Sequence, residues 1–175
     1  MKTFLFLCGP NGIGKTTIAK EILHRLPRSA YVDSDACRMM NPFVLNDDTV
    51  PTVARNISSM LLSYLDCPLV DTVLFTYGFH GRRREVFSLV EKALSHARFH
   101  FVPFLLWCEE TENLRRMQKD GRSERRIQTA LQDSRKAFSQ VSYPAVSYTH
   151  LSALSSSFAR RLSSASLSTS SSIGI

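Results

Sequence analysis

The 175-residue sequence has no apolar run that approaches the roughly 20 residues of a membrane-spanning helix. It also lacks the paired cysteines of a zinc site or a disulfide framework. Its cysteines stand far apart, with no histidine at ligand spacing, at Cys8, Cys37, Cys67 and Cys108. The first apolar run, residues 4–8, is shorter than the roughly 7 to 15 apolar residues of a secretory signal. We therefore expect a cytoplasmic protein with reduced thiols and no membrane partner.

Acidic residues are few and end early. Twenty-two Lys and Arg against fifteen Asp and Glu give a net charge of +7, which suits a polyanionic partner but also enzymes that handle phosphorylated substrates. The last acidic residue is Asp133, and eleven of the last twenty-five residues are serine. We expect one domain over residues 1–150 and a serine-rich tail over 151–175, a short helix followed by disordered chain. A native tail and a shifted reading frame both remain open.

Short apolar runs alternate with helical patterns along the domain. We expect strands at 4–8, 30–32, 72–76, 99–108 and, more weakly patterned, 145–148. We expect helices at 16–26, 50–65, 109–117 and 124–138, and an arginine-led helix that buries Val86, Leu89, Val90, Ala93 and Leu94. This alternation predicts an α/β fold with a mostly parallel sheet.

Residues 9–16, GPNGIGKT, match the pattern GxxxxGK[ST] between a buried strand and a helix. Such a loop wraps backbone N–H groups around a phosphate, the lysine binds the β- and γ-oxygens, and the hydroxyl ligates Mg²⁺. A chance turn is the alternative, but both flanking elements argue against it. The predicted nucleotide site is Gly9, Asn11, Gly12, Ile13, Gly14, Lys15, Thr16 and Thr17, with Lys15 also catalytic.

These letters resemble the loop of P-loop NTPases, and GPNGIGKTT is similar to that of ABC transporter ATPases. We reject that family, because the sequence has neither its upstream strand with a base-stacking aromatic residue nor its LSGGQ-like signature. With an Asp-x-Asp after the second strand and a late arginine-rich break, residues 1–142 resemble the nucleoside-monophosphate-kinase-like group, which includes shikimate and gluconate kinases. The resemblance implies a P-loop NTPase fold, a three-layer αβα arrangement with a mostly parallel five-stranded sheet and a short arginine-rich lid.

The Asp-x-Asp segment, Asp33-Ser34-Asp35, is similar to that of shikimate kinases. Alternate residues of a strand point to the same side, so both carboxylates should face the P-loop. The resemblance implies that Asp33, with Thr16, holds Mg²⁺ and that Asp35 is the base at the acceptor hydroxyl. A turn with a helix cap is the alternative, because Asp and Ser favour both.

Arg38 follows Asp35 by three residues, a spacing similar to that of polynucleotide and zeta-toxin-like kinases, where the arginine helps place the acceptor. A solvated arginine is the alternative. The sequence has no basic stripe interleaved with aromatic residues of the kind that stacks single-stranded bases. A small-molecule acceptor is therefore favoured over nucleic acid.

A group of basic residues surrounds Asp120-Gly121: Arg115, Arg116, Lys119, Arg122, Arg125 and Arg126. The same region of small kinases is a lid whose arginines close over the nucleotide and stabilise the transferring phosphoryl group. Arg122 and Arg126 share a helix face and are the expected catalytic pair. Arg115 or Arg116 is expected to bind the nucleotide from the other side. A charged solvent-facing surface is the alternative.

No acidic residue ends the third strand, so metal binding falls to Thr16 and Asp33. In the loop that follows, Gly78, Phe79 and His80 are candidates for contact with the acceptor. The run that starts at Arg82 and continues to Arg84 is a candidate for binding its anionic group. The alternatives are a hydrogen-bonded loop histidine and a solvated helix start.

Together these features predict an ATP- and Mg²⁺-dependent kinase that transfers the γ-phosphoryl group to a hydroxyl or phosphate of a small molecule. ATP rather than GTP is implied by the resemblance alone. Two alternatives stay open: a kinase of nucleotides or nucleic-acid ends, and a nucleotide-dependent switch or ATPase. The sequence does not indicate the acceptor or the oligomeric state.

Overall fold

A computed structural model describes residues 1–138 and 145–147. Its strands are β1 (Lys2–Cys8), β2 (Ser29–Asp33), β3 (Thr72–Tyr77), β4 (Phe99–Trp107) and β5 (Ala145–Ser147). They form one sheet in the order β2-β3-β1-β4-β5, and every recorded pair is parallel. Four longer strands carry the sheet, and the three-residue β5 extends it beside β4. The expected parallel α/β fold is confirmed, whereas the predicted tail at 151–175 lies outside the described residues.

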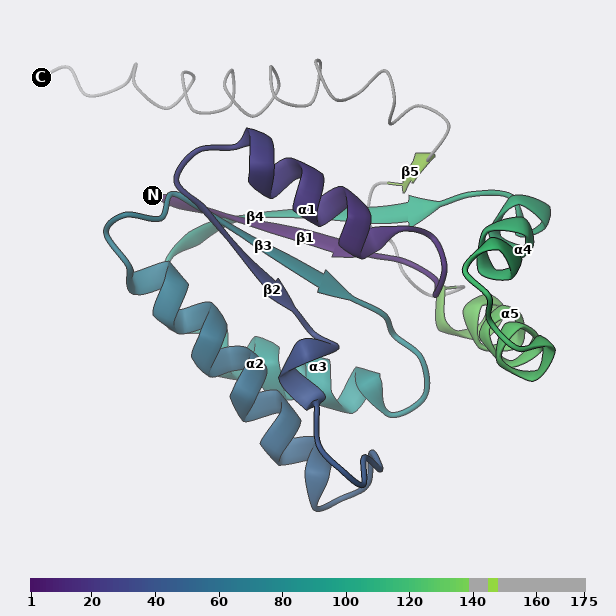
Figure 1. Ribbon diagram of the computed structural model, residues 1–175. Helices are drawn as coiled ribbons and strands as arrows, with labels where there is room; N and C mark the ends of the chain where they lie inside the picture. Colours follow the sequence, from purple (N-terminus) through teal and green to yellow (C-terminus); the bar gives the residue numbers. More distant parts are fainter. Residues whose placement is uncertain (139–144, 148–175) are drawn as a thin grey trace, which may run out of the picture.

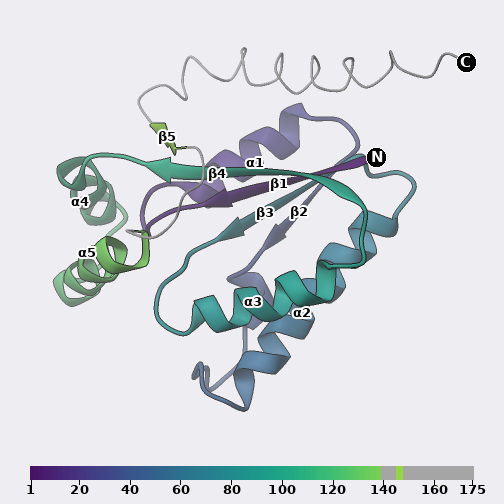
Figure 2. The same cartoon turned by 180° about the vertical axis from the view of Figure 1, so that it is seen from behind.

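The helices are α1 (Lys15–Arg25), η1 (Ala36–Arg38, a 3₁₀ turn), α2 (Thr49–Asp66), α3 (Arg83–Leu94), α4 (Glu110–Lys119) and α5 (Glu124–Phe138). Helix α1 covers one face of the sheet, and α2 and α3 cover the other (Figure 1). The reverse view shows α4 and α5 beyond the end of β4 (Figure 2). This is the predicted three-layer arrangement. Within the described part of the chain, no helix is long and apolar enough to cross a membrane.

Strand β1 is buried on both faces, as its continuous apolar sequence predicts. Phe4 and Phe6 pack toward α2 and α3, whereas Leu5 and Leu7 pack toward α1. Successive side chains of a strand point to opposite faces, so one apolar run supplies both layers of the core. The P-loop therefore begins from a strand that lies inside the sheet, between β3 and β4, and is buried on both faces.

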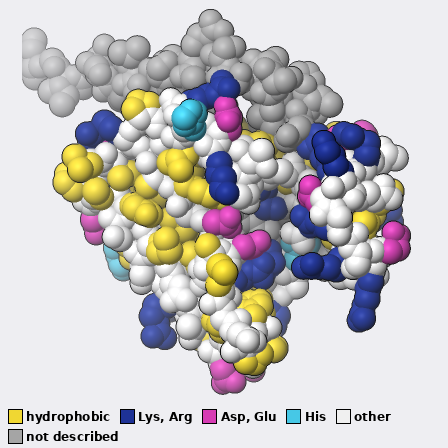
Figure 3. Space-filling view, viewed as in Figure 1, with side chains coloured by type: hydrophobic (Ala, Val, Ile, Leu, Met, Phe, Trp, Pro, Cys, Tyr) yellow, Lys and Arg dark blue, Asp and Glu magenta, His cyan; other side chains and the backbone are white. Residues whose placement is uncertain are grey.

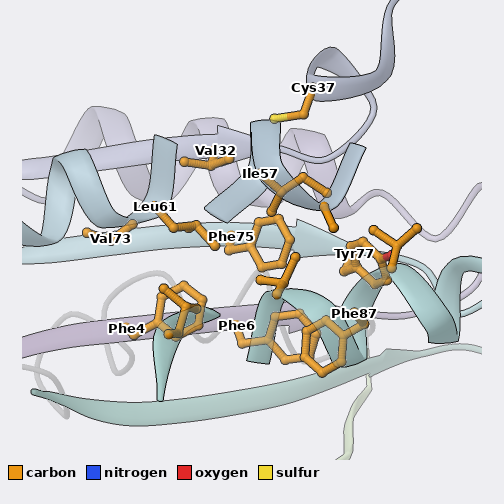
Figure 4. Packing of buried hydrophobic residues seen from close by; sticks show 14 of the residues in the cluster. Phe4, Phe6, Val32, Cys37, Ile57, Leu61, Val73, Phe75, Tyr77 and Phe87 are labelled. Atoms are coloured by element: carbon orange, nitrogen blue, oxygen red, sulfur yellow. The ribbon is translucent and has the colours of Figure 1, made fainter. Parts of the chain in front are cut away.

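Aromatic rings fill the core between the sheet and α3 (Figure 4). The ring centroid of Phe6 lies 5.1 Å from that of Phe87 and 5.7 Å from that of Phe75. Phe79, in the loop after β3, meets Phe87 edge-on at 5.1 Å. Such stacked and edge-on pairs add to the free energy of burial. They fix the loop between β3 and α3 against the sheet.

One inward face was predicted incorrectly. Leu89 is 41% exposed and Ala93 is also exposed, whereas Phe87 is buried with Val86 and Val90. Helix α3 presents positions 86, 87, 90 and 94 to the core, and Leu89 falls on its solvent side. A helical pattern with apolar residues at both 87 and 89 does not decide which one faces inward.

We predict that Phe87→Ala lowers the free energy of unfolding by about 3 to 5 kcal/mol, because it leaves a cavity among the rings. Leu89→Ala is the matched control and should cost less than about 1 kcal/mol, since much of its side chain is already in water. Urea denaturation followed by circular dichroism measures both values. Equal losses in the two variants would contradict this packing.

Candidate active site

An open cleft of about 240 Å³ lies at the carboxyl ends of β1, β2 and β3. Its lining residues are Asn11, Gly12, Gly14, Lys15, Thr16, Thr17, Asp33, Ser34, Asp35, Thr76, Gly78, Arg83, Asp120 and Arg122. Parallel strands end at the same edge, which is why segments far apart in sequence meet here. Lysine and arginine side chains gather over α4 and α5 beside the main body (Figure 3).

The P-loop fills the turn between β1 and α1. Gly12 and Gly14 have φ angles of +82° and +94°, a region that side chains with a Cβ rarely adopt. Gly14 precedes the first residue of α1, and the first turn of that helix contains no acidic residue. The positive N-terminal end of α1 therefore faces the cleft with no carboxylate of its own first turn to oppose an incoming phosphate.

Lys15 is held against its own loop. Its Nζ donates hydrogen bonds to the carbonyl oxygens of Gly9 and Pro10, both at 2.9 Å. Burial lowers the pKa of Lys15 to about 8, an effect that Asp35 opposes and Arg83 reinforces. A polyphosphate in the loop would offer this ammonium stronger acceptors than two neutral carbonyls.

Thr16 and Asp33 come together as the sequence predicts. The Thr16 hydroxyl donates to Oδ2 of Asp33 at 3.4 Å, and Oδ1 of Asp33 accepts the backbone N–H of Asp35 at 2.9 Å. A hydroxyl beside a carboxylate is an all-oxygen donor pair, which suits Mg²⁺ with several of its waters retained. The residues present thus fit a magnesium ion bound between α1 and β2.

Asp35 lies in the same cleft, paired with arginine. Its Oδ1 accepts hydrogen bonds from Arg38 Nη2 at 2.6 Å and from Nε at 3.1 Å, and Arg83 Nη1 lies 3.9 Å away. Partial burial pushes the pKa of Asp35 up, but Arg38 and Arg83 outweigh it and bring the pKa below its usual value. Asp35 is therefore ionised at neutral pH and can accept a proton or a hydrogen bond.

The loop after β3 contributes backbone rather than its two large side chains. Gly78 lines the cleft, whereas Phe79 and His80 are buried. A Cβ at Gly78 would lie 3.0 Å from His80 Nδ1, so the histidine packs directly behind the cleft wall. Burial, reinforced by Arg83, lowers the pKa of His80 to about 4. His80 is thus neutral at physiological pH and lies behind the surface that an acceptor would meet.

Among the three consecutive arginines, only Arg83 lines the cleft. Arg82 points away and forms ion pairs with Asp47 and with Glu85, the latter at 2.7 Å. Arg84 is exposed and lies over the ring of Phe79. The sequence analysis took the run from Arg82 to Arg84 as a candidate for binding the acceptor's anionic group, and Arg82, the residue that starts it, does not line the cleft, whereas Arg83 does.

Two of the arginines predicted for the lid, Arg122 and Arg116, lie near the P-loop or the cleft, each in a different environment. Arg122, in the turn between α4 and α5, lines the cleft and lies 3.7 Å from Asp120. Arg116 donates a long hydrogen bond, 3.4 Å, to the carbonyl of Ile13 in the P-loop. Arg122 therefore faces the cleft, whereas Arg116 contacts the P-loop from outside the cleft lining and forms an ion pair with Glu112 at 2.7 Å.

Two other arginines predicted for the site do not line the cleft. Arg115 is exposed and pairs with Glu112, and Arg126 lies exposed on α5. The interrupted helix explains this, because α5 begins only at Glu124 and Arg122 lies in the preceding turn. Arg122 and Arg126 therefore do not share a helix face.

Helix α4 packs directly on the P-loop, a contact that the sequence did not indicate. A Cβ at Gly12 would lie 2.5 Å from Met117 Cγ and 2.9 Å from Asn113 Oδ1. Both side chains are buried, and Asn113 Oδ1 has no hydrogen-bond partner among the described residues. The sequence of this charged helix does not indicate that its asparagine is buried, because the burial arises only from the contact with the P-loop.

The loop, the lysine at the start of α1 and the parallel sheet define a P-loop nucleotide-binding protein. A family model described as an AAA domain matches residues 1–143, and the chain belongs to this family. A search of curated proteins found no match.

Solved structures share the fold at low sequence identity. The tunicamycin resistance protein of Deinococcus radiodurans has a TM-score of 0.61 and 18% identity, covering 93% of this chain and 96% of its own. The Mycobacterium tuberculosis APS kinase has a TM-score of 0.59 and 14% identity, and the match covers 84% of this chain and 88% of its own. The Acinetobacter baumannii shikimate kinase has a TM-score of 0.56 and 17% identity, and the match covers 98% of this chain and 97% of its own. The expected fold of the small P-loop kinases is confirmed.

We predict that Gly12→Ala is far more costly than Gly81→Ala. Both glycines have positive φ, but Gly81 has no atom within 4 Å of an added Cβ, whereas Gly12 meets Met117. The conformational cost is about 1 to 2 kcal/mol at each site, and overpacking adds about 1 to 3 kcal/mol at Gly12. Chemical denaturation gives the difference. Similar losses at the two positions would show that α4 does not press on the loop.

We also predict that ADP affinity falls as pH rises above about 8. Above that pH Lys15 loses its proton in the free protein, whereas in the ADP complex the neighbouring phosphates keep Lys15 protonated. The association constant for ADP should therefore fall nearly tenfold per pH unit. Calorimetric titrations between pH 7.5 and 9.5 measure this slope. In Lys15→Met, affinity should be low and the slope absent, and an unchanged slope in that variant would rule out Lys15 as its origin.

Proposed function

We propose that the protein is an ATP- and Mg²⁺-dependent phosphotransferase that moves the γ-phosphoryl group to a hydroxyl or phosphate of a small molecule. The observation that carries this proposal is a single cleft lined by both Lys15 and Asp35. A nucleotide switch or simple ATPase needs the phosphate-binding loop. It does not need a second ionised carboxylate across the cleft, poised to receive a substrate proton.

The residues divide the work of the transfer. Lys15 and the N-terminus of α1 bind the β- and γ-phosphates and stabilise their charge. Thr16 and Asp33 would hold the Mg²⁺ ion, which when bound neutralises charge on the phosphate oxygens. Arg122, which lines the cleft, would face the charge that spreads onto the transferring group.

In transfer to an alcohol, a bond forms between the acceptor oxygen and the γ-phosphorus. The bond from that phosphorus to the β–γ bridging oxygen breaks, and ADP keeps the bonding electron pair. Asp35 accepts the hydroxyl proton, directly or as a hydrogen bond that orients the nucleophile. Because phosphoryl transfer has a loose transition state, orientation by Asp35 matters more than basicity. A carboxylate with a lowered pKa is suited to that task.

The structures with the same fold include a shikimate kinase solved with shikimate and an APS kinase solved with AMPPNP and APS. Those ligands are an ATP analogue and small molecules, which supports ATP as the donor and a small acceptor here. The size of the cleft, about 240 Å³, is consistent with a small acceptor.

We predict that ADP release in the presence of Mg²⁺ is stimulated by a small-molecule metabolite extract. Lys15→Ala should reduce it by about 100-fold or more, and removal of Mg²⁺ with EDTA should abolish it. Asp35→Asn should lower the extract-stimulated rate of ADP release by about 100-fold while leaving nucleotide binding intact. A coupled assay for ADP measures all of these.

Asp66→Asn, at the far end of α2, is the matched control and should behave like the wild type. Hydrolysis that is equal with and without extract, and unaffected by Asp35→Asn, would contradict the phosphotransferase proposal and favour a simple ATPase.

A further inference from the structure

A group of side-chain oxygen atoms gathers where the first turn of α1 meets β2 and β3. Tyr31 and Asp33 are alternate residues of β2, and Thr76 of β3 lies opposite Asp33 in the parallel register. Alternate side chains of a strand point to the same face, and both Tyr31 and Leu74, the alternate neighbour of Thr76, pack in the core under α1. Tyr31, Asp33 and Thr76 therefore share the face that α1 covers, beside Thr16 in the first turn of that helix (Figure 1).

The Tyr31 hydroxyl lies at the centre of this group. Its oxygen is 2.9 Å from Oγ1 of Thr76, and it also interacts with the side chains of Thr16 and Asp33. Thr76 is 2% exposed and lines the cleft, whereas the partly buried Tyr31 is not part of the lining. One tyrosine hydroxyl, set back from the cleft, thus interacts with both side chains that fit a magnesium ion.

Strand β3 supplies a neutral hydroxyl to this part of the cleft. Its side chain in the lining is that of Thr76 rather than a carboxylate, so Asp33 provides the negative charge beside Thr16. The charge and the rigidity of the ligands both determine how tightly an oxygen site binds a cation. With one carboxylate in the pair, the affinity for Mg²⁺ depends strongly on how Thr16 and Asp33 are oriented.

The proton of Thr16 needs an acceptor when the site is filled. A hydroxyl has one proton and two lone pairs, so a threonine that turns a lone pair to a cation must donate its proton to a neighbouring acceptor. Thr16 now donates to Oδ2 of Asp33 over 3.4 Å, and Oδ1 of Asp33 accepts the N–H of Asp35. When Oδ2 turns to the same cation, the Tyr31 oxygen remains as an acceptor for Thr16.

We propose that Tyr31 is a positioning residue of the magnesium site, whose hydroxyl accepts the Thr16 proton and donates its own to Asp33, so that lone pairs of both side chains face the ion. Thr76 donates to the second lone pair of this hydroxyl and holds it in place. Hydrogen-bond partners behind metal ligands fix the orientation of the ligands, and their loss typically lowers metal affinity by about 10- to 100-fold. This inference rests on the Mg²⁺ dependence of the proposed phosphotransferase and adds a residue that acts through the two ligands.

The test measures the binding of Mn²⁺, an ion that takes the same oxygen ligands as Mg²⁺, to the complex with ADP, formed with the protein in excess. Electron paramagnetic resonance of the free ion gives the dissociation constant. Tyr31→Phe keeps the ring in the core and removes only the hydroxyl, and it should weaken Mn²⁺ binding by about 10-fold. ADP affinity without metal, measured by calorimetry in EDTA, should be unchanged, because the P-loop and Lys15 bind the phosphates without Tyr31.

Three further variants test the group. Thr76→Val removes the second hydroxyl and should also weaken Mn²⁺ binding, whereas Thr76→Ser keeps a hydroxyl and should recover most of the affinity. Tyr64→Phe on α2, the same change at another partly buried tyrosine, is the matched control and should behave like the wild type. In steady-state assays, Tyr31→Phe should raise the Mg²⁺ concentration for half-maximal ADP release by about 10-fold, with the KM for ATP at saturating Mg²⁺ unchanged.

Equal Mn²⁺ affinity in Tyr31→Phe and Tyr64→Phe would overturn the inference while leaving the Mg²⁺-dependent function in place. A loss of ADP affinity in EDTA as large as the loss of Mn²⁺ affinity would also overturn it, because Tyr31 would then act on the whole loop. If the wild-type complex binds no more Mn²⁺ than ADP alone binds, the magnesium dependence of the proposed function fails, and the inference fails with it.

Discussion

The hydrogen-bonded register of three parallel strands positions the cleft. Strand β1 lies between β3 and β4, with Cys8 opposite Tyr77 and Leu105, and β2 pairs with β3 so that Asp33 lies opposite Thr76. The chain leaves this edge of the sheet after each of β1, β2 and β3, and each of these exits supplies a different part of the site. The first supplies the phosphate loop, the second the two carboxylates, and the third the backbone of Gly78 together with Arg83. A shift of one residue in any of these pairs would turn the polar groups toward the core.

The electrostatics of the cleft follow from this convergence. Four cationic side chains, Lys15, Arg38, Arg83 and Arg122, contribute to a region in which Asp33 and Asp35 are the central anions. Burial acts in opposite directions on the two groups: it is the main cause of the lowered pKa of Lys15, whereas it raises the pKa of Asp35, and there the neighbouring cations Arg38 and Arg83 bring the pKa below its usual value. A bound nucleotide with its phosphates would bring the missing negative charge.

Much of this organisation could be predicted from the sequence. The P-loop, the alternation of strands and helices and the Asp-x-Asp segment depend on local patterns of two to eight residues, and such patterns survive in the folded chain. The failures depend on tertiary contacts. Arg82 and Arg83 are chemically identical neighbours, and the first points away because it pairs with Glu85 and with Asp47, which is distant in the sequence. The buried Asn113 and the exposed Leu89 are likewise decided by which neighbour packs against the helix.

The close approach of Gly12 and Met117 should also couple the residue types at these two positions among homologous chains. Position 12 can gain a side chain only if position 117 gives up volume, and position 117 can be large only while position 12 has none. Homologous chains should therefore vary at these two positions together, with a small residue always present at one of them. The sequence interval between them, more than one hundred residues, would make such paired changes a marker of chains in which this helix rests on the loop.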